Sequence, residues 1–196
     1  PAASRSTLPD MPLTLTARQA LILPIAVFAW QVLGAARAFR PVEGERGSPL
    51  AGVISLGFVA LVVNSGIEPV NLALFGIACV GLIGALGLFE WARRTVRGKY
   101  FSWVFSSDTP TFLYTAGPFA YVRNPFYTSY LLTMASTALM RPSIFRALVF
   151  LAMVIYFHMA ALHEERKFAR SPFASEYERY RQRTGRFLPR ISGVLR

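Results

Sequence analysis

The chain has 196 residues, of which 54% are hydrophobic and only 16% are charged, and its net charge is +11 at pH 7. A soluble domain of this length carries more charge and shorter apolar runs. The buried helices of a soluble bundle are apolar over only about 10 to 14 residues. The composition therefore argues against a soluble protein and predicts an integral membrane protein.

Five long apolar runs occupy nearly half of the chain, at residues 17–36, 50–67, 70–89, 125–140 and 144–162. A helix rises about 1.5 Å per residue, so roughly 20 residues cross the hydrocarbon core of a bilayer. The first three runs fit that length. The last two reach it only with polar-ended flanks such as Tyr127 and His163. The predicted fold is all-α, with about five transmembrane helices.

Residues 1–16 are rich in Pro, Ser and Thr, and we expect a loose N-terminal segment there. Residues 17–90 hold the first three predicted transmembrane helices. Pro24 is expected to kink the first of them, and Glu68-Pro69 to make a tight turn after the second. Small residues recur at every third position of the third helix, which favours close helix packing: Ala78, Gly81, Gly84 and Gly87.

The chain becomes amphipathic after Glu165. Phe173, Tyr177 and Tyr180 fall on one helical face, with Arg179, Arg181 and Arg183 around them. This pattern predicts a C-terminal interfacial amphipathic helix. Such a helix can bind anionic lipid at the membrane surface or form a lid over a cofactor, and both interpretations stay open.

The basic residues predict the orientation in the membrane. With five spans, most of the 21 Lys and Arg residues fall on one side, and the other side receives only Arg5, Arg18, Arg141 and Arg146. Loops rich in Lys and Arg stay cytoplasmic. The N-terminus is therefore expected to be extracytoplasmic, with the C-terminus cytoplasmic and attracted to anionic lipid heads. Nucleic-acid binding needs a soluble basic face with readout groups and is not expected.

Two polar clusters bracket the last two apolar runs, one at residues 117–127 and the other at residues 163–166. Ionisable groups where a membrane helix meets water are costly and usually functional. In the first cluster, Arg123 and Asn124 precede Pro125, which suits the first turn of a helix. The free N–H groups of that turn can bind an anion. Alternatively, Arg123 extends to lipid phosphate and Asn124 caps the helix.

The second cluster contains two adjacent acids, Glu164 and Glu165. Successive residues of a helix point about 100° apart, so we expect these acids to have different roles. Both lie near a helix C-terminus, where the macrodipole disfavours negative charge, so a cationic partner from the protein or a ligand is expected. His158 and His163 lie close by, but their spacing matches no recognised metal site, and no metal is expected.

The order of short motifs adds a family resemblance. The chain supplies Trp91-Ala92, Phe101-Ser102, Leu113-Tyr114-Thr115-Ala116-Gly117-Pro118-Phe119, Tyr121-Val122-Arg123-Asn124-Pro125-Phe126-Tyr127, Glu164-Glu165, Glu176-Tyr177-Glu178-Arg179-Tyr180 and Arg186-Phe187-Leu188-Pro189. In this order they resemble the isoprenylcysteine carboxyl methyltransferase and phospholipid methyltransferase family. These are integral membrane enzymes that use S-adenosyl-L-methionine. On this basis, residues 91–196 form the methyltransferase-like catalytic region, which comprises an interfacial loop, two membrane helices and the amphipathic helix.

The resemblance also implies site residues. The cofactor would be lined by Thr111, Phe112, Leu113, Tyr114, Gly117, Phe119, Asn124, Pro125, Phe126 and Tyr127, and Glu165 would hold its amine or hydroxyls. Asn124 replaces the usual His of the family, and Phe119 replaces a Tyr. Ala161 stands where the prenylcysteine enzymes place a substrate-binding Arg. The cofactor site therefore resembles that of the family more closely than the prenylcysteine site does.

The sequence thus predicts methyl transfer from S-adenosyl-L-methionine to a lipophilic or membrane-associated acceptor at the cytoplasmic face. Arg123 is expected to orient an anionic substrate or the cofactor carboxylate, and Glu164 is the best candidate for a general base. Two alternatives remain: an NADPH-dependent membrane reductase resembling the sterol reductases, and a non-catalytic scaffold with a degenerate site. Membrane lipids, including anionic ones, are the expected partners.

Overall fold

The computed structural model describes residues 15–40, 49–63, 70–97, 101–102, 109–110 and 112–190. The helices are α1 (Ala17–Ala20), α2 (Ile22–Ala38), α3 (Pro49–Val63), α4 (Leu72–Thr95), the short 3-10 helix η1 (Gly117–Ala120), α5 (Pro125–Leu139), α6 (Ile144–Ala169) and α7 (Ala174–Arg183). Strands β1 (Phe39–Arg40) and β2 (Phe101–Ser102) form a short parallel pair. The predicted Glu68-Pro69 turn and nearly all of the predicted N-terminal segment lie outside the described residues.

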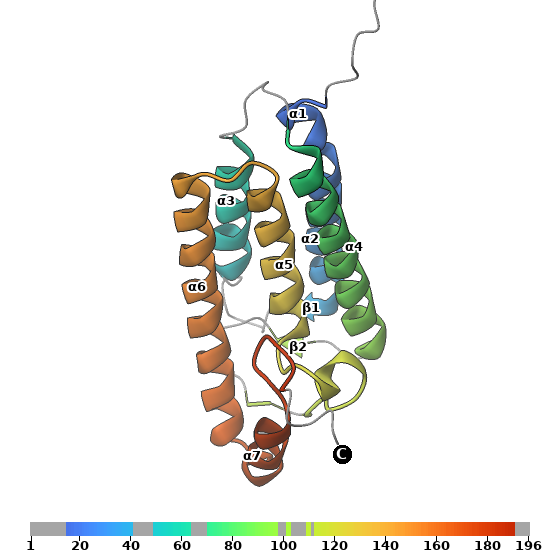
Figure 1. Cartoon of the computed structure of the whole chain (residues 1–196). Coiled ribbons are helices and arrows are strands. Elements are labelled where there is room, and N and C mark those ends of the chain that lie inside the picture. The colour runs from blue at the N-terminus through green and yellow to red at the C-terminus, as the bar shows by residue number, and fades with distance from the viewer. Residues whose placement is uncertain are drawn as a thin grey trace, which may run out of the picture.

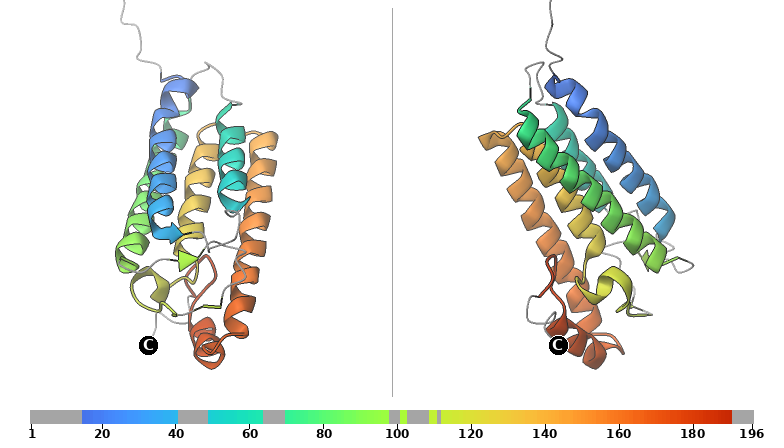
Figure 2. Two further views of the ribbon diagram at one scale, coloured as in Figure 1. Left: turned by 180° about the vertical axis from the view of Figure 1, so that it is seen from behind. Right: turned by 45° about the vertical axis from the view of Figure 1, so that its right-hand side comes forward.

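Five helices, α2 to α6, run side by side as an elongated bundle (Figure 1). Opposite views show α5 between its neighbours (Figure 2), and it contacts each of α2, α3, α4 and α6. Helix α6 continues past the start of α5 and leads into α7 at one end of the molecule, whereas α1 lies at the other end (Figure 1). We call the end that carries α7 and η1 the polar end.

Local sequence explains where several helices begin. The side chain of Asn71 accepts hydrogen bonds from the backbone N–H groups of Ala73 and Leu74 and caps α4. Ser143 caps α6 in the same manner. The first apolar run is interrupted at Leu21, between α1 and α2. Pro24 follows three residues later and has no N–H to donate to the carbonyl of Ala20, which explains a break at this position.

Helix α5 is the most buried helix, and it carries hydroxyl side chains into the interior: Ser129, Thr133, Ser136 and Thr137. These hydroxyls are paired within the protein. Thr133 donates to Gln31 of α2 at 3.1 Å, and Thr137 donates to the carbonyl of Thr133 at 2.8 Å. A buried polar group is tolerated when it is hydrogen-bonded, and in a bilayer such bonds help to join helices.

Large apolar side chains cover the outside of the bundle, among them Ile22, Leu33, Leu56, Val80, Ile83, Leu148 and Ile155. Hydrogen-bonded polar groups in the interior and large apolar side chains on the outside are the pattern of a protein surrounded by lipid. Three helical stretches are long and apolar enough to cross a membrane: Arg18–Arg37, Leu72–Thr95 and Ile144–Ala169. The prediction of an all-helical integral membrane protein is confirmed. Helices α3 and α5 have 15 residues each, and their crossing of the bilayer stays a prediction.

The small residues of α4 have different neighbours. A Cβ atom added to Gly81 would collide with Ser136 of α5, and one added to Gly84 would contact Leu132. Both positions allow the close helix packing that the spacing predicts. A Cβ on Gly87 would meet nothing within 4 Å, so the packing interpretation is wrong at this position.

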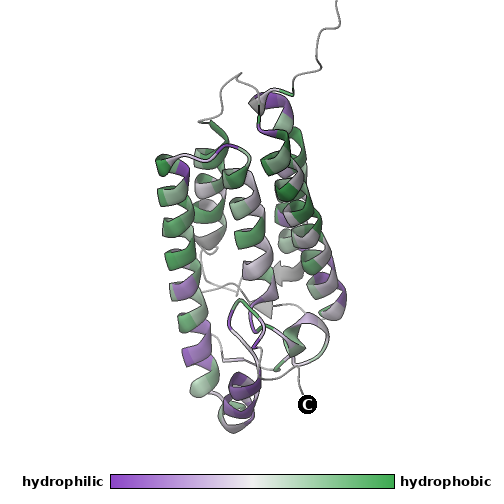
Figure 3. Ribbon diagram, in the orientation of Figure 1, coloured by the Kyte–Doolittle hydropathy of each residue, from purple (hydrophilic) through white to green (hydrophobic). Residues whose placement is uncertain are grey.

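Hydrophilic residues gather at the lower end of α4 and α6 and on α7 (Figure 3).

Candidate active site

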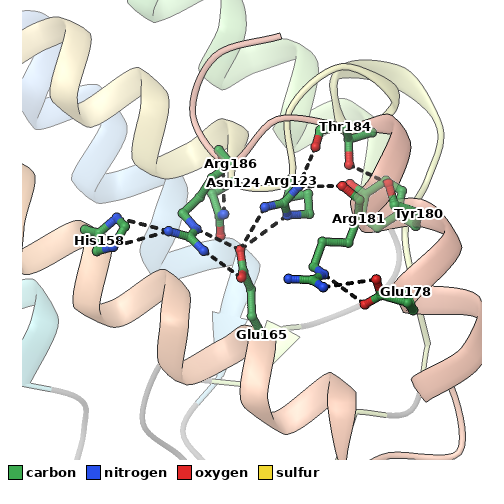
Figure 4. Close-up of polar contacts among 9 residues, drawn as sticks. All are labelled: Arg123, Asn124, His158, Glu165, Glu178, Tyr180, Arg181, Thr184 and Arg186. Atoms are coloured by element: carbon green, nitrogen blue, oxygen red, sulfur yellow. Dashed lines mark hydrogen bonds and ion pairs between the residues drawn. The ribbon is translucent and has the colours of Figure 1, made fainter. Parts of the chain in front are cut away.

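Glu165, near the end of α6, lies between two arginines (Figure 4). Arg186 approaches both carboxylate oxygens, with Nε 2.8 Å from Oε1 and Nη2 2.9 Å from Oε2. Arg123 donates to Oε1 from Nη2 at 3.1 Å and from Nε at 3.3 Å. Only 11% of the Glu165 side chain and 8% of the Arg123 side chain are exposed. The expected cationic partner of this acid is therefore supplied by the protein.

The contact with Glu165 also changes the properties of Arg186. The hydrogen bond to the carboxylate raises the pKa of Arg186, and the nearby charge of Glu165 adds to that effect. A charge-assisted pair in a two-point geometry is stronger and more directional than a neutral hydrogen bond. Nη1 of Arg186 also lies 3.1 Å from a ring nitrogen of His158. Arg186 thus contacts two residues of α6, His158 and Glu165, that are two helical turns apart on the same face.

The chain after α7, residues 184–188, docks on the turn before α5; we call it the C-terminal segment. The backbone N–H of Arg123 donates to the carbonyl of Gly185 at 2.8 Å, and the N–H of Gly185 donates to the carbonyl of Tyr121 at 3.2 Å. Val122 and Gly185 form a parallel bridge. These bonds satisfy backbone groups that would otherwise be orphaned, and they bring residues about 60 positions apart into one structure.

Side chains reinforce the same docking. The guanidinium of Arg123 donates to the carbonyls of Arg181, at 3.2 Å, and of Thr184. The hydroxyl of Thr128 donates to the carbonyl of Phe187 at 3.0 Å. Tyr180 of α7 donates to the carbonyl of Phe119 in η1 at 2.7 Å. The C-terminal segment is therefore held from several directions and forms part of the wall of the polar end.

Asn124 does not cap helix α5, which was one of the two roles that the sequence allowed for it. Its side chain makes no capping bond to α5. Instead, its backbone N–H and its side-chain amide both donate to the carbonyl of Arg186, each at 3.2 Å. Pro125 occupies the first position of α5, where its missing N–H is not needed. The first N–H groups of a helix have no acceptor within the helix, so those at the start of α5 are able to bind an anion.

The two adjacent acids point to different partners, as the helical geometry predicts. Glu164 accepts a hydrogen bond from the hydroxyl of Tyr127 at 3.2 Å. Tyr127 is buried and its ring lies 5.2 Å from that of Phe157. Glu164 is thus directed toward the start of α5, whereas Glu165 is directed toward the two arginines.

Aromatic rings continue from the turn into the bundle. Tyr114 stacks on Phe119, with ring centroids 5.6 Å apart, and Phe112 contacts Tyr114 edge-on at 5.1 Å. Phe119 then meets Phe126 of α5 at 6.4 Å. Burial raises the pKa of Tyr114 further above the physiological range, in which a tyrosine hydroxyl is already neutral. Such rings present electron-rich faces that attract organic cations.

Most of the predicted cofactor residues lie in this region. Tyr114, Phe119, Phe126 and Tyr127 are joined through ring contacts or the core cluster, whereas Phe112 and Leu113 are half-buried at its edge. Gly117 opens η1 with a φ of 60°, a left-handed conformation that glycine adopts readily. Thr111 lies outside the described residues.

Sequence reasoning missed the importance of Arg186 and Thr184. Arg186 belongs to a quoted family motif, but no role was predicted for it. The signal that could have identified it was the placement of Glu165 near a helix C-terminus, which called for a cation. The aromatic face of α7 is also taken up by protein, because Tyr177 stacks on Phe168 at 4.8 Å and Tyr180 is bound to η1.

These features define a class of protein: an all-helical membrane protein with a polar site at one end of its bundle. The family model for phospholipid methyltransferase matches residues 72–176, which is more than half of the chain, and the chain belongs to this family. It is thereby placed among the membrane methyltransferases. A search of curated proteins and a search of solved structures each found no match. The matched stretch includes the turn before α5 and Glu165, and it ends before the C-terminal segment.

Proposed function

We propose that the protein transfers a methyl group from S-adenosyl-L-methionine to a lipophilic or membrane-associated acceptor at the cytoplasmic face of the bilayer. The observation that carries this proposal is the meeting of two distant motifs. The turn before α5 and the acids of α6 come together through Arg123–Glu165 and Tyr127–Glu164 contacts. Both motifs lie within the stretch that matches the methyltransferase family.

The residues at the polar end fit the chemical groups of this cofactor. When bound, S-adenosyl-L-methionine supplies a methyl group activated by its attachment to a sulfonium cation. The rings of Tyr114 and Phe119 suit that cation. The N-terminus of α5 suits the cofactor carboxylate. Together with an acid for the ammonium group, these groups complement every charge that the cofactor carries.

Glu165 is our candidate for the acid that binds the ammonium group or the hydroxyls of the cofactor. A carboxylate has about four acceptor sites. Oε1 accepts from both arginines, whereas Oε2 accepts from Arg186 alone among the described residues. Oε2 therefore keeps capacity for one further donor. Glu165 would then hold the cofactor and the C-terminal segment at the same time.

We infer that Arg123 acts mainly by positioning. Its guanidinium is already bound to Glu165 and to two backbone carbonyls, so it holds the turn before α5 in place. Glu164 is our candidate for accepting a proton from the acceptor, and the bond from Tyr127 orients it. An acceptor that is already deprotonated needs no base, and for it the site contributes positioning and water exclusion.

The location of the basic residues supports a cytoplasmic site. Arg93, Arg94 and Arg97 lie at the end of α4, which is at the polar end of the bundle (Figure 1). Because basic residues favour the cytoplasmic side, the polar end and the C-terminus face the cytoplasm in this proposal, and the N-terminus faces away from it.

The ion pairs do not favour the reductase alternative. NADPH carries phosphates and needs several free arginines at its site. Arg123 and Arg186 are both committed to Glu165 in this structure, and the family match is to methyltransferases.

Calorimetric titration of the detergent-purified protein with S-adenosylhomocysteine tests the proposal, with NADPH titrated in parallel. We expect saturable binding of S-adenosylhomocysteine alone, weakened at least tenfold by Glu165→Gln. Glu178→Gln is the matched control, because Glu178 lies on the exposed face of α7 and should bind normally. Binding of NADPH alone, or of neither compound by folded protein, would overturn the proposal.

A further inference from the structure

The side chains on one exposed face of α4 change from aliphatic to aromatic to cationic along the helix. Val80 and Ile83 are exposed and aliphatic, Trp91 follows at 48% exposure, and Arg94 follows with 76% of its side chain exposed. These positions share one helical face. At about 1.5 Å per residue, Trp91 lies roughly 12 Å beyond Ile83, and Arg94 roughly 5 Å further. Aliphatic, aromatic and cationic groups thus follow the order of acyl chains, interface and phosphates in a bilayer leaflet.

A second aromatic residue widens this face. Tyr121, at the end of η1, is 52% exposed, and its ring centroid lies 6.0 Å from that of Trp91. Tyr121 is close in sequence to Arg123, yet its ring points to the outside of the bundle. One turn before Trp91, the space beside Gly87 is open. The two rings and this gap form a surface against which a lipid glycerol region and acyl chain can lie.

The end of α4 carries a net positive charge even when its ion pairs with Glu90 are taken into account. Glu90 is bound closely by Arg93, with Nη2 2.7 Å from Oε2, and by the indole N–H of Trp30 at 2.8 Å. Arg94 is only loosely paired with the same acid, at 3.8 Å. Arg97 is exposed immediately after the helix. Among the described residues, Glu90 is the acid that Arg93 and Arg94 contact, and one carboxylate does not balance three arginines. Arg94 and Arg97 therefore present net positive charge at the end of α4.

From these observations we propose that Trp91, Tyr121, Arg94 and Arg97 form a binding site for the phosphate headgroup of an anionic phospholipid. The arginines bind the phosphate, and the rings lie at the level of the glycerol backbone. This site does not depend on methyl transfer, because its four side chains are exposed, whereas those of Arg123 and Glu165 are nearly buried. It would hold η1 and the end of α4 at a fixed depth in the membrane.

Fluorescence quenching tests this site directly. Trp30→Phe and Trp103→Phe leave Trp91 as the single tryptophan, and this variant is reconstituted in vesicles that contain brominated phosphatidylglycerol or brominated phosphatidylcholine at equal mole fraction. We expect stronger quenching by the anionic lipid, at low salt above all. Arg94→Gln with Arg97→Gln should reduce that preference roughly fivefold or more, while quenching by phosphatidylcholine persists.

Arg18→Gln, at the opposite end of the bundle, is the matched control and should keep the preference. Circular dichroism of each variant checks that the helices are retained. Equal quenching by both lipids, no quenching by either, or a preference that survives loss of both arginines would overturn the lipid site. None of these outcomes bears on the binding of S-adenosylhomocysteine, so failure of this site and failure of the proposed function can be distinguished.

Discussion

Arg186 donates hydrogen bonds to both carboxylate oxygens of Glu165, at 2.8 and 2.9 Å, and the two residues are 21 positions apart in the chain. The contact joins the end of α6 to the C-terminal segment, and through Arg123 it reaches the turn before α5. Glu165 lies within the family match, whereas Arg186 lies beyond its end at residue 176. The candidate active site therefore depends on a part of the chain that the family match does not cover.

We expect Arg186→Met to destabilise the protein by about 2 kcal/mol, because hydrogen bonds to charged groups contribute roughly 1.5–3 kcal/mol and Glu165 loses its two-point partner. Thermal unfolding in detergent measures this, and limited proteolysis should show faster cleavage after α7. Arg181→Gln is the control, since its pair with Glu178 is half-exposed and its loss should change stability little. Equal effects of the two variants would contradict the anchoring role.

Glu164→Gln should lower the turnover number by about 100-fold or more if Glu164 accepts a proton from the acceptor. Its affinity for S-adenosylhomocysteine should stay roughly unchanged, because binding is assigned to Glu165. Tyr127→Phe removes the hydroxyl that orients Glu164 and should give a smaller loss of turnover. Methylation of membrane lipid with radiolabelled cofactor measures both. Full activity of Glu164→Gln would show that the acceptor reacts without this base.

Gly117→Ala should destabilise the protein by about 1–2 kcal/mol. Its φ of 60° is unfavourable for a residue with a Cβ atom, and the added atom would collide with the Thr95 side chain. Gly76→Ala is the matched control, because a Cβ there meets nothing within 4 Å and alanine favours helix. We expect the melting temperature to fall for the first variant and to hold or rise for the second.

Stability should fall at alkaline pH because of the α7 tyrosines. Burial raises the pKa of both Tyr177 and Tyr180 above their ordinary value. A tyrosine with a raised pKa in the folded state contributes stability that is fully present below about pH 10 and is lost as the pH rises further. Melting curves from about pH 8 to pH 11 should show this decline. In Tyr177→Phe the slope should be shallower, and an identical slope would contradict the assignment.

The membrane class and the position of the helices followed from local chemistry. The backbone polar groups of a long apolar run in lipid can be satisfied within a helix. The run at residues 70–89 therefore predicted helix α4 without knowledge of its neighbours. The motif order around Arg123 and Glu165 predicted the family correctly. The choice between a lipid-bound surface helix and a lid over a cofactor for α7 could not be resolved in this way, because periodicity shows that a face is apolar and does not show what covers it.

The sequence by itself determined that this is a helical membrane protein of a methyltransferase family, because apolar length and motif order are local properties of the chain. Only the tertiary structure decided that Glu165 is shared by Arg123 and Arg186, that Asn124 binds the C-terminal segment, and that Gly87 faces outward. The pairings of Glu165 and Asn124 join residues 21 to 62 positions apart. Their partners are selected by the packing of the bundle and by the need to satisfy each buried charge and backbone group where α5, α6 and the C-terminal segment meet.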